Sequence, residues 1–404
     1  MTRLETLGFS PARLARIDRF LKEQYIETGK LAGAILAIAR RGEIVHQSVA
    51  GLADRERGVP MRDDTIFRLY SMTKPLTSIA FMMLVEEGLV TLNDPVHAFI
   101  PAWRDLGVFT SGVPGSFQTR RPANAMRIVD LLRHTSGLTY GFQMRSNVDA
   151  AYRHHDIGAV EGDVPLAQMI ELLATLPLEF SPGDAWNYSV STDVLGYLIG
   201  IISGIPFERY MRTRLLDPLG MHDTDFFVPE TKQARLAACY AMNAAGESVL
   251  YDDPATSRFR TPPCFISGGG GLVGTAADYL RFCHMLLNGG AANGHRFLAP
   301  RSLKFMTMNH LPGGRELTEL SRSMFSEAIY SGLGFGLGFA VVVDRAKTMM
   351  PGNVGEYFWG GVASTTFWID SLDEIAVVLL TQLIPSSAWP IRQQLRALVY
   401  GAME

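Results

Sequence analysis

The chain has 404 residues, 47% of them hydrophobic and 19% charged, and its 37 basic and 40 acidic side chains give a formal net charge of -3. This length predicts two or three structural units around a large core, and no basic stripe interleaved with aromatic residues points to a nucleic-acid partner. The longest apolar run, 194–203, is about half of the ~20 residues that a membrane span needs.

The first predicted elements are a helix and a β-hairpin. Residues 10–28 form an amphipathic pattern, with Ser10 as a helix cap and Pro11 at the first helical position. Two apolar runs within 32–51 flank the turn sequence 40–43, which is typical of a hairpin. We therefore expect the sheet to begin at the N-terminal end of the chain.

The segment 70–88 carries the most informative chemistry. A nearly all-round apolar run that stops at Gly88 predicts a buried helix over about 72–87. Ser71 then caps this helix or lies in its first turn, and Lys74 shares its face. The helix dipole and burial both lower the pKa of such a lysine, and a serine nucleophile needs a neutral base. A bare Ser-x-x-Lys is usually a cap and a surface lysine, but this one heads an apolar helix.

From residue 87 to about residue 263, helical patterns alternate with loops. Helices are expected at 128–134, 166–176, 191–202 and 207–215. The segment 109–125 is rich in Gly, Pro, Ser and Thr, so we expect a long loop there that forms a wall of the site. This region is predicted to be a mainly helical lobe.

The C-terminal quarter returns to strands. A helix is expected at 276–287, strands at 336–343, 356–359, 364–369 and 375–381, and a last helix at 390–403. Strands at both ends with helices between them predict an α+β fold: one antiparallel sheet built from both chain ends, with flanking helices and an inserted helical lobe. The predicted units are 1–86 (the N-terminal part of the sheet domain, ending in the nucleophile helix), 87–263 (the lobe) and 264–404 (the C-terminal part of the sheet domain).

Two further segments complete a candidate catalytic site. Tyr188 lies on a loop that leads into a predicted helix, and a tyrosine beside a lysine can share its proton and pass it on. Trp359, Gly360 and Gly361 end a predicted strand where a ligand can reach backbone N–H groups, and such a donor with the Ser71 N–H makes an oxyanion hole. Taken alone, Tyr188 is more often an ordinary half-buried aromatic residue, and a Gly-Gly pair is more often a turn or bulge.

Five sequence blocks occur in a recognisable order. They are Ser-Met-Thr-Lys at 71–74, Leu-Leu-Arg-His-Thr-Ser-Gly-Leu at 131–138, Tyr-Ser-Val at 188–190, the glycine-rich run 268–278 and Trp-Gly-Gly at 359–361. In order and spacing they resemble the serine β-lactamase-like hydrolases related to class C β-lactamases and DD-peptidases. The chain is most similar to the family VIII carboxylesterases, and the resemblance covers nearly the whole chain.

The resemblance implies a role for each matching residue. Ser71 would be the nucleophile, and Lys74 with Tyr188 the general base and acid. The Trp-Gly-Gly block stands where the lactamases have Lys-Thr-Gly, which implies the backbone N–H groups of Ser71 and Val362 as the oxyanion hole. The residues implied to contact the substrate are Trp359, Gly360, Gly361, Val190 and, less directly, Tyr140.

Two departures from the lactamase pattern bear on the substrate. Val190 stands where class C lactamases have an asparagine, and Trp359 replaces a lysine that would attract the carboxylate of a β-lactam. An amide donor and a cation have thus become apolar groups. The site should favour neutral acyl esters, and any β-lactamase activity is expected to be weak.

The sequence therefore predicts a serine carboxylesterase that hydrolyses small to medium acyl esters through an acyl-enzyme, without a metal or cofactor. An acyltransferase, a weak β-lactamase or a D-amino-acid peptidase on the same scaffold stays open, as does a penicillin-sensor-like binding domain that is acylated without turnover. The expected partner is a small-molecule ester, with no nucleic acid and no membrane span. Whether the chain forms a homo-oligomer is left open.

Three other signals are set aside. Gly269, Gly271 and Gly274 match the dinucleotide-binding pattern, but no strand is expected before them, so we expect no such cofactor. The nine histidines show no metal-ligand spacing. The three cysteines are scattered and the segment 1–20 lacks an apolar core, so we expect no signal peptide and a reduced, cytoplasmic setting.

Overall fold

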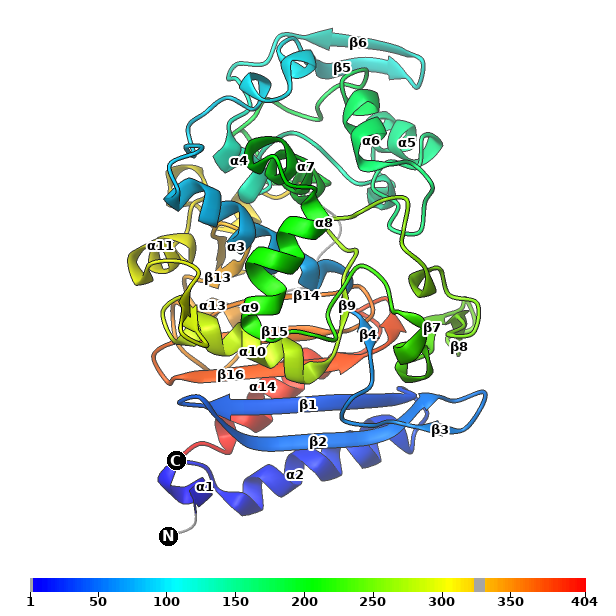
Figure 1. The fold of residues 1–404 in the computed structure, drawn as a ribbon, viewed down its shortest axis with the longest axis vertical. Helices are drawn as coiled ribbons and strands as arrows, with labels where there is room; N and C mark the ends of the chain where they lie inside the picture. The colour runs from blue at the N-terminus through cyan, green and yellow to red at the C-terminus, as the bar shows by residue number, and fades with distance from the viewer. Residues whose placement is uncertain (1–2, 323–330) are drawn as a thin grey trace.

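The computed structural model describes residues 3–322 and 331–404, and an antiparallel sheet forms the lower half of the molecule as drawn in Figure 1. Its strands are β1 (Gly33–Arg40), β2 (Glu43–Asp54), β3 (Val59–Pro60), β12 (Leu333–Phe335), β13 (Ala340–Val342), β14 (Tyr357–Gly360), β15 (Thr366–Asp370) and β16 (Ile375–Thr381). They are ordered β12-β13-β14-β15-β16-β1-β2-β3. Strands from both chain ends share the sheet, which confirms the predicted α+β fold.

The centre of the sheet joins the two ends of the chain. β1 pairs with β16, from Ala34 opposite Thr381 to Arg40 opposite Ile375, and with β2 through the predicted hairpin. All of β16 is buried, as is β1 except for Arg40. Such two-sided burial requires cover on both faces. Figure 1 shows α2 (Pro11–Leu21) below the sheet and α10 (Ala276–Leu287) above it.

The other helices lie mainly above the sheet in Figure 1. They are α1 (Arg3–Thr6), α3 (Thr73–Glu86), α4 (Ile128–Leu132), α5 (Asn147–His154), α6 (Leu166–Leu173), α7 (Ser191–Ser203), α8 (Phe207–Tyr210), α9 (Asp217–Leu219), α11 (Pro300–Met306), α12 (Leu317–Leu320), α13 (Arg345–Thr348) and α14 (Ile391–Gly401). The exceptions are α1, which lies below the sheet in Figure 1, and α14, which lies on the face that α2 covers. α14 packs against α2, which brings the two chain ends together.

α3 is the central element of the molecule. Every residue from 73 to 84 is buried, and α3 packs against α7. A helix that is apolar all round needs cover on every side, and the sheet below and the lobe above supply it. The short strands β4 (Phe67–Arg68) and β9 (Val273–Gly274) pair antiparallel and bring the glycine-rich segment beside the chain that enters α3.

The prediction of a long loop at 109–125 is wrong. β5 (Val108–Val113) and β6 (Ser116–Arg120) form a hairpin instead, at the end of the molecule remote from the sheet (Figure 1). Pro114 and Gly115 form its turn, and Gly112, with φ of 105°, lies near the irregularity in its register. Both strands carry mostly polar, exposed side chains, so their sequence lacks the apolar alternation that marks a half-buried strand.

Two further expectations need correction. The lobe at 87–263 also contains β7 (Cys239–Met242) and β8 (Ser248–Asp252), which form a sheet with β17 (Leu383–Ile384). The strand expected at 336–343 is interrupted, because residues 336–339 make a turn between β12 and β13 and only β13 lies inside that range. Glycines at 336 and 338 permit this turn, and Gly338 has φ of 95°. The unit boundaries at 86/87 and 263/264 stay a prediction.

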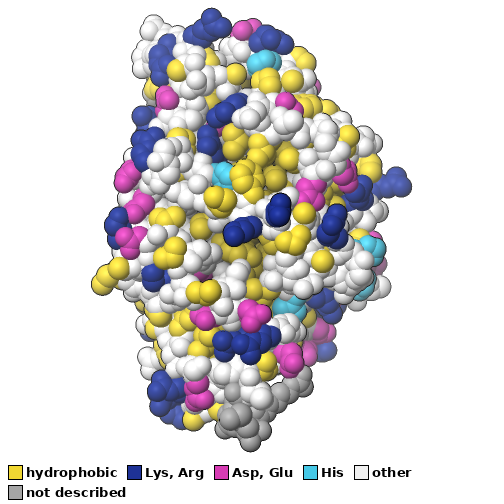
Figure 2. Space-filling view, turned by 90° about the vertical axis from the view of Figure 1, so that its left-hand side faces the viewer, with side chains coloured by type: hydrophobic (Ala, Val, Ile, Leu, Met, Phe, Trp, Pro, Cys, Tyr) yellow, Lys and Arg dark blue, Asp and Glu magenta, His cyan; other side chains and the backbone are white. Residues whose placement is uncertain are grey.

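The surface is mixed in character. Figure 2 shows hydrophobic side chains gathered near the middle of one face, with basic and acidic side chains interspersed around them.

Two remaining short strands, β10 (Ala291–Ala292) and β11 (His295–Arg296), form a separate hairpin. Across the described part of the chain, none of the helices has both the length and the apolar character of a membrane span.

Candidate active site

Ser71 and Lys74 lie within hydrogen-bond distance of each other at the start of α3. Ser71 is half-buried in the 3₁₀ turn η2 (Tyr70–Met72), and Lys74 lies in the first turn of α3. Lys74 Nζ donates to Ser71 Oγ at 3.2 Å and to the Gly269 carbonyl oxygen at 2.7 Å. Lys74 is 2% exposed. The structure thus brings together the predicted nucleophile and base, and α3 begins at Thr73, one residue after the predicted start.

The residue before Ser71 has a strained backbone. Tyr70 has φ of 45°, in the left-handed region, where a residue of this kind costs about 1–3 kcal/mol. Its buried ring makes an edge-to-face contact with Phe259, with the centroids 6.2 Å apart. This packing helps to hold the sharp turn that carries the chain from β4 into α3 and places Ser71 at its corner.

The glycine-rich segment packs directly against its neighbours. A Cβ atom on Gly269 would lie 2.7 Å from Asp193 Oδ2 and 2.8 Å from Tyr140 Oη, and one on Gly268 would lie 2.6 Å from the Thr192 carbonyl oxygen. Side chains therefore do not fit at these positions. The run that resembles a dinucleotide-binding pattern serves close packing, and it directs the Gly269 carbonyl at the lysine.

Asp193 holds this segment in place and was not predicted as a site residue. It is buried in the first turn of α7 and accepts hydrogen bonds from Ser267 Oγ at 2.5 Å, from Gly269 N at 2.9 Å and from Tyr140 Oη at 3.4 Å. Burial raises the pKa of Asp193, and the charge of Lys74 opposes that shift. Its place in the first turn of a predicted helix was a signal, because carboxylates are favoured there.

Tyr188 lies beside the lysine in the structure. Lys74 Nζ is 4.5 Å from the centroid of the Tyr188 ring and 5.2 Å from that of Tyr140. Trp359 Nε1 donates to Tyr188 Oη at 3.3 Å, and Tyr188 is 1% exposed. Aromatic ring faces stabilise an ammonium group. Lys74 can therefore hold a proton in a buried position next to both Ser71 and Tyr188.

His134 packs against the Tyr188 ring. The two ring centroids are 5.0 Å apart, and His134 Nδ1 lies 3.2 Å from Ser189 Oγ. Burial, reinforced by the positive charge of Lys74, holds the pKa of His134 well below its usual value of 6.5. His134 is therefore neutral near pH 7, and it supports Tyr188 without adding a second positive charge.

The end of β14 lies against the chain that precedes Ser71. A Cβ atom on Gly361 would lie 2.5 Å from the Leu69 carbonyl oxygen. Val362 follows, is half-buried, and packs on the same small hydrophobic cluster as Tyr70. The turn that carries the Val362 N–H and the start of α3 are thus neighbours, which is what the predicted oxyanion hole requires.

Arg392 fixes this turn, and no motif in the sequence pointed to it. Its Nη2 donates to the carbonyl oxygens of Gly361 at 2.8 Å and of Thr365 at 2.7 Å. A Cβ atom on Gly360 would lie 2.7 Å from the same nitrogen, so glycine makes room for the guanidinium. Because charge-assisted hydrogen bonds are strong, Arg392 holds both sides of the turn around Val362 in one geometry.

The remaining predicted substrate contacts differ in exposure. Tyr140 is 5% exposed and stacks on Phe142, with the centroids 4.6 Å apart, and Phe142 is 51% exposed. Val190 has no exposed surface, and its Cγ1 lies 2.5 Å from where a Cβ on Gly158 would be. In this structure Val190 can influence a substrate only through its neighbours, whereas Phe142 presents an accessible ring beside Tyr140.

The arrangement supplies the parts of a nucleophilic site. The Ser71 hydroxyl lies within hydrogen-bond distance of the Lys74 amine, the amine lies beside the Tyr188 ring, and the turn at Gly361 lies against the chain that precedes Ser71. Such a set can form and hydrolyse an acyl-enzyme. Within residues 3–322 and 331–404, no three His, Cys, Asp or Glu side chains are grouped as metal ligands.

Comparisons with known proteins place the chain among hydrolases. The profile of the family described as Beta-lactamase matches residues 17–400. Protein Rv1367c of Mycobacterium tuberculosis is 36% identical over 362 residues, covering 89% of this chain and 88% of the relative. Esterase EstB of Burkholderia gladioli is 31% identical over 407 residues, covering 96% and 95%. The structure of EstCE1, a hydrolase with promiscuous acyltransferase activity, is 28% identical with a TM-score of 0.80, covering 96% of this chain and 99% of that one.

The depressed pKa of His134 predicts a loss of stability in mild acid. Below pH 6.5 the unfolded chain binds a proton at this residue that the folded chain refuses, so stability falls by about 1.4 kcal/mol for each pH unit until the folded pKa is reached. Between pH 7.5 and 5.5, the Tm of His134→Gln should therefore fall less than the Tm of the wild type. His295→Gln, at an exposed position, is the control. If the Tm of His134→Gln falls as much as that of the wild type, the low pKa of His134 in the folded chain is contradicted.

The contacts of Arg392 predict a role in positioning the oxyanion hole. Arg392→Met should lower kcat for ester hydrolysis about 10-fold or more with little change in KM, because a loosened donor weakens only the transition state. The exposed neighbour Gln393, changed to Ala, is the control on the same helix. A folded Arg392→Met enzyme with the wild-type kcat would remove Arg392 from this role.

Proposed function

We propose that this chain, which belongs to the beta-lactamase family, is a serine carboxylesterase that hydrolyses small to medium acyl esters through an acyl-enzyme. The resemblance to family VIII esterases within the β-lactamase-like serine hydrolases is confirmed by the family match and by the similarity to EstB and EstCE1. The chain is thus a serine hydrolase of this family. Its reaction, residues and substrates are the proposal.

One observation carries the proposal. The buried amine of Lys74 lies 3.2 Å from Ser71 Oγ and 4.5 Å from the centre of the Tyr188 ring. A serine hydroxyl becomes a nucleophile only when a base takes its proton, and a candidate base must lie within hydrogen-bond reach. These two distances give the hydroxyl a base and give that base a neighbour able to relay the proton.

The proposed first half-reaction forms the acyl-enzyme. Lys74, as a neutral amine, takes the Ser71 proton while Ser71 Oγ bonds to the ester carbonyl carbon. The N–H groups of Ser71 and Val362 stabilise the negative charge that develops on the carbonyl oxygen. Tyr188, which exchanges protons with Lys74, then gives a proton to the alcohol oxygen as its bond to the acyl carbon breaks.

The proposed second half-reaction reverses these roles with water. A water molecule loses a proton to the Lys74 and Tyr188 pair and bonds to the acyl carbon. The bond from that carbon to Ser71 Oγ then breaks, the hydroxyl regains its proton, and the acid leaves. These steps use only the named side chains, two backbone N–H groups and water.

The chemistry around Tyr188 supports neutral esters as substrates. Trp359 presents an indole here, with its N–H on the Tyr188 oxygen, and Val190 is apolar. Neither group attracts a carboxylate, so an anionic lactam or peptide gains little binding energy at this position. We therefore propose only weak β-lactamase or D-amino-acid peptidase activity, and we favour turnover over the acylated binding domain because the chain retains Ser71, Lys74 and Tyr188 together.

Acyl transfer is the second candidate function. The solved structure most relevant to it is EstCE1, described as a hydrolase with promiscuous acyltransferase activity. An acyl-enzyme passes its acyl group to an alcohol by the same steps that pass it to water.

We also propose a reducing compartment such as the cytoplasm, since Cys239, Cys264 and Cys283 are all free thiols.

Removal of each member of the relay should abolish esterase activity. Ser71→Ala should lower kcat for p-nitrophenyl acetate by about 10⁴-fold or more, since the acyl-enzyme no longer forms. Lys74→Ala and Tyr188→Phe should lose a comparable share of kcat, because the Ser71 proton then has no route to the leaving alcohol. The measurement is initial release of p-nitrophenol by variants whose Tm matches that of the wild type.

Matched substitutions at exposed positions control for general damage. Ser111→Ala, Lys304→Ala and Tyr251→Phe change the same residue types away from the site and should keep wild-type rates. Substantial turnover by folded Ser71→Ala would refute the nucleophile. A Tyr188→Phe enzyme with the wild-type rate and pH profile would exclude Tyr188 from the relay.

Competition between water and an alcohol tests acyl transfer. If deacylation is rate-limiting, added methanol should increase p-nitrophenol release and yield the methyl ester beside the free acid, because both acceptors use one intermediate. The product ratio should rise in proportion to methanol concentration. Acid as the sole product at every concentration of methanol would rule out the transfer function.

A further inference from the structure

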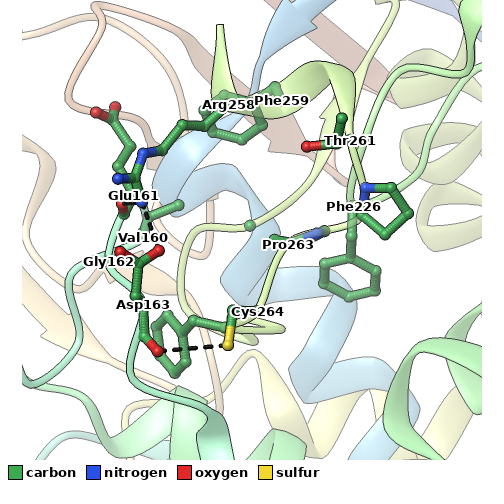
Figure 3. A pocket seen from close by; sticks show the side chains of 13 residues that line it. Val160, Glu161, Gly162, Asp163, Phe226, Arg258, Phe259, Thr261, Pro263 and Cys264 are labelled. Carbon is green, nitrogen blue, oxygen red and sulfur yellow. Dashed lines mark hydrogen bonds and ion pairs between the residues drawn. The ribbon is translucent and has the colours of Figure 1, made fainter.

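A cavity of about 330 Å³ lies between two segments that the proposed mechanism does not use. Figure 3 shows residues 160–163 on one side and residues 258–265 on the other, with the ring of Phe226 at the edge of the space between them. Ligand pockets of enzymes commonly have volumes of about 300–1,000 Å³. The cavity is therefore large enough to hold part of a substrate.

The lining of the cavity is mainly aromatic and apolar. Phe226, Phe259 and Phe265 line it and are at most 6% exposed in total, and Val160 and two prolines add further apolar surface. An apolar cavity of about 150 Å³ holds one benzene. A cavity of this volume can thus accept a group with one or two rings, and ring pairs in edge or offset contact would add to the binding.

The charged side chains that line the cavity are Glu161, Asp163 and Arg258, and the cation is paired with Asp163. Arg258 Nη1 bonds Asp163 Oδ1 at 2.7 Å and also the Glu161 carbonyl oxygen, and Cys264 Sγ lies 3.4 Å from the Asp163 carbonyl oxygen. Dashed lines in Figure 3 mark these bridges between the two segments. The guanidinium is already matched by a carboxylate, so the rim holds the segments together and does not select a charged ligand.

The cavity adjoins the chain that carries the nucleophile. A Cβ atom on Gly270 would lie 3.0 Å from Val160 Cγ2 on one side and 3.7 Å from the Tyr70 carbonyl carbon on the other. Gly271 lines the cavity, and Phe259 packs on the Tyr70 ring. One glycine thus separates the cavity wall from the peptide bond that precedes Ser71.

The position of the proton relay decides which part of an ester can point to the cavity. The leaving alcohol must accept a proton from Tyr188, which lies on the Lys74 side of Ser71, beside Trp359. The carbonyl oxygen must face the turn at Val362. The cavity lies on the Tyr70 side, so the acyl group is the substituent that remains for it.

We propose that this cavity is the acyl-binding pocket and that it selects neutral esters whose acyl group carries one or two apolar rings. The proposal rests on the proposed esterase function and adds the class of substrate. A bulky acyl group would bury against the three phenylalanine rings and Val160, while the alcohol leaves on the opposite side. Esters of acetate do not reach the cavity and are hydrolysed without it.

Filling the cavity tests the proposal. Val160→Trp should lower kcat/KM for p-nitrophenyl 2-naphthylacetate about 10-fold or more, because the ring of the substrate and the new indole compete for one space. The loss should be several-fold smaller for p-nitrophenyl acetate, whose acyl group does not reach the cavity. Val113→Trp, at an exposed position of the β5–β6 hairpin, is the matched control and should change neither rate.

The acetate ester separates this proposal from the proposed function. If acetate is hydrolysed through Ser71 but Val160→Trp affects both esters equally, or neither, the acyl pocket is refuted and the esterase stands. If Val160→Trp instead lowers kcat/KM for 2-naphthylmethyl acetate and not for p-nitrophenyl 2-naphthylacetate, the cavity holds the alcohol group and the acyl assignment is wrong. If Ser71→Ala keeps its activity on acetate, the proposed function itself fails.

Cys264 provides a test in the wild-type chain, which does not depend on the folding of a variant. It lines the cavity and is exposed, whereas Cys239 and Cys283 are buried. 2-Naphthylacetate, the acid product, should slow the alkylation of Cys264 by N-ethylmaleimide several-fold and saturably, and acetate should not. An alkylation rate unaffected by 2-naphthylacetate at concentrations above the KM of its ester would overturn the proposal.

Discussion

The structure depends on one buried contact, the amine of Lys74 held between Ser71 Oγ and the carbonyl oxygen of Gly269. A lysine that is 2% exposed has lost most of its hydration, so its charge is tolerable only where oxygens and ring faces replace water. The Gly269 carbonyl and the faces of Tyr188 and Tyr140 supply that replacement. The same contacts leave the amine aimed at the serine, so the constraint that permits its burial also orients it for proton transfer with Ser71.

The rest of the fold serves to keep this contact in place from several directions. The central pairing of β1 with β16 joins the two chain ends into one sheet, and α3 lies buried on it. Asp193, on α7 in the lobe, fixes the glycine-rich segment. Arg392, on the last helix, fixes the turn beside Ser71. Residues from the lobe and from both parts of the sheet thus meet at one point, and a small displacement of any of them would misalign the site.

Local patterns in the sequence predicted those parts of this arrangement that depend on neighbouring residues. The i, i+3 spacing brings Ser71 and Lys74 together on any helix, and the hairpin at 40–43, the helix 276–287 and the strand 375–381 follow from their own turn and apolar signals. The recognised family then supplied Tyr188 and the Trp-Gly-Gly turn. Asp193 and Arg392 were missed because their partners are 76 and 31 residues away, and no local pattern records such pairs. The hairpin at β5 and β6 was missed because polar, exposed strands lack the alternation that identifies a strand.

The proposed mechanism requires Ser71 to carry the acyl group during turnover. Rapid acid quenching of the enzyme with p-nitrophenyl acetate, followed by mass spectrometry of its peptides, tests this claim directly. The proposed mechanism predicts one added acetyl group on the peptide that contains Ser71, appearing within the first turnover and disappearing when the ester is consumed. An acetyl group that builds up and decays on any other residue, or steady turnover with no acetylated peptide under conditions that accumulate the intermediate, would contradict it.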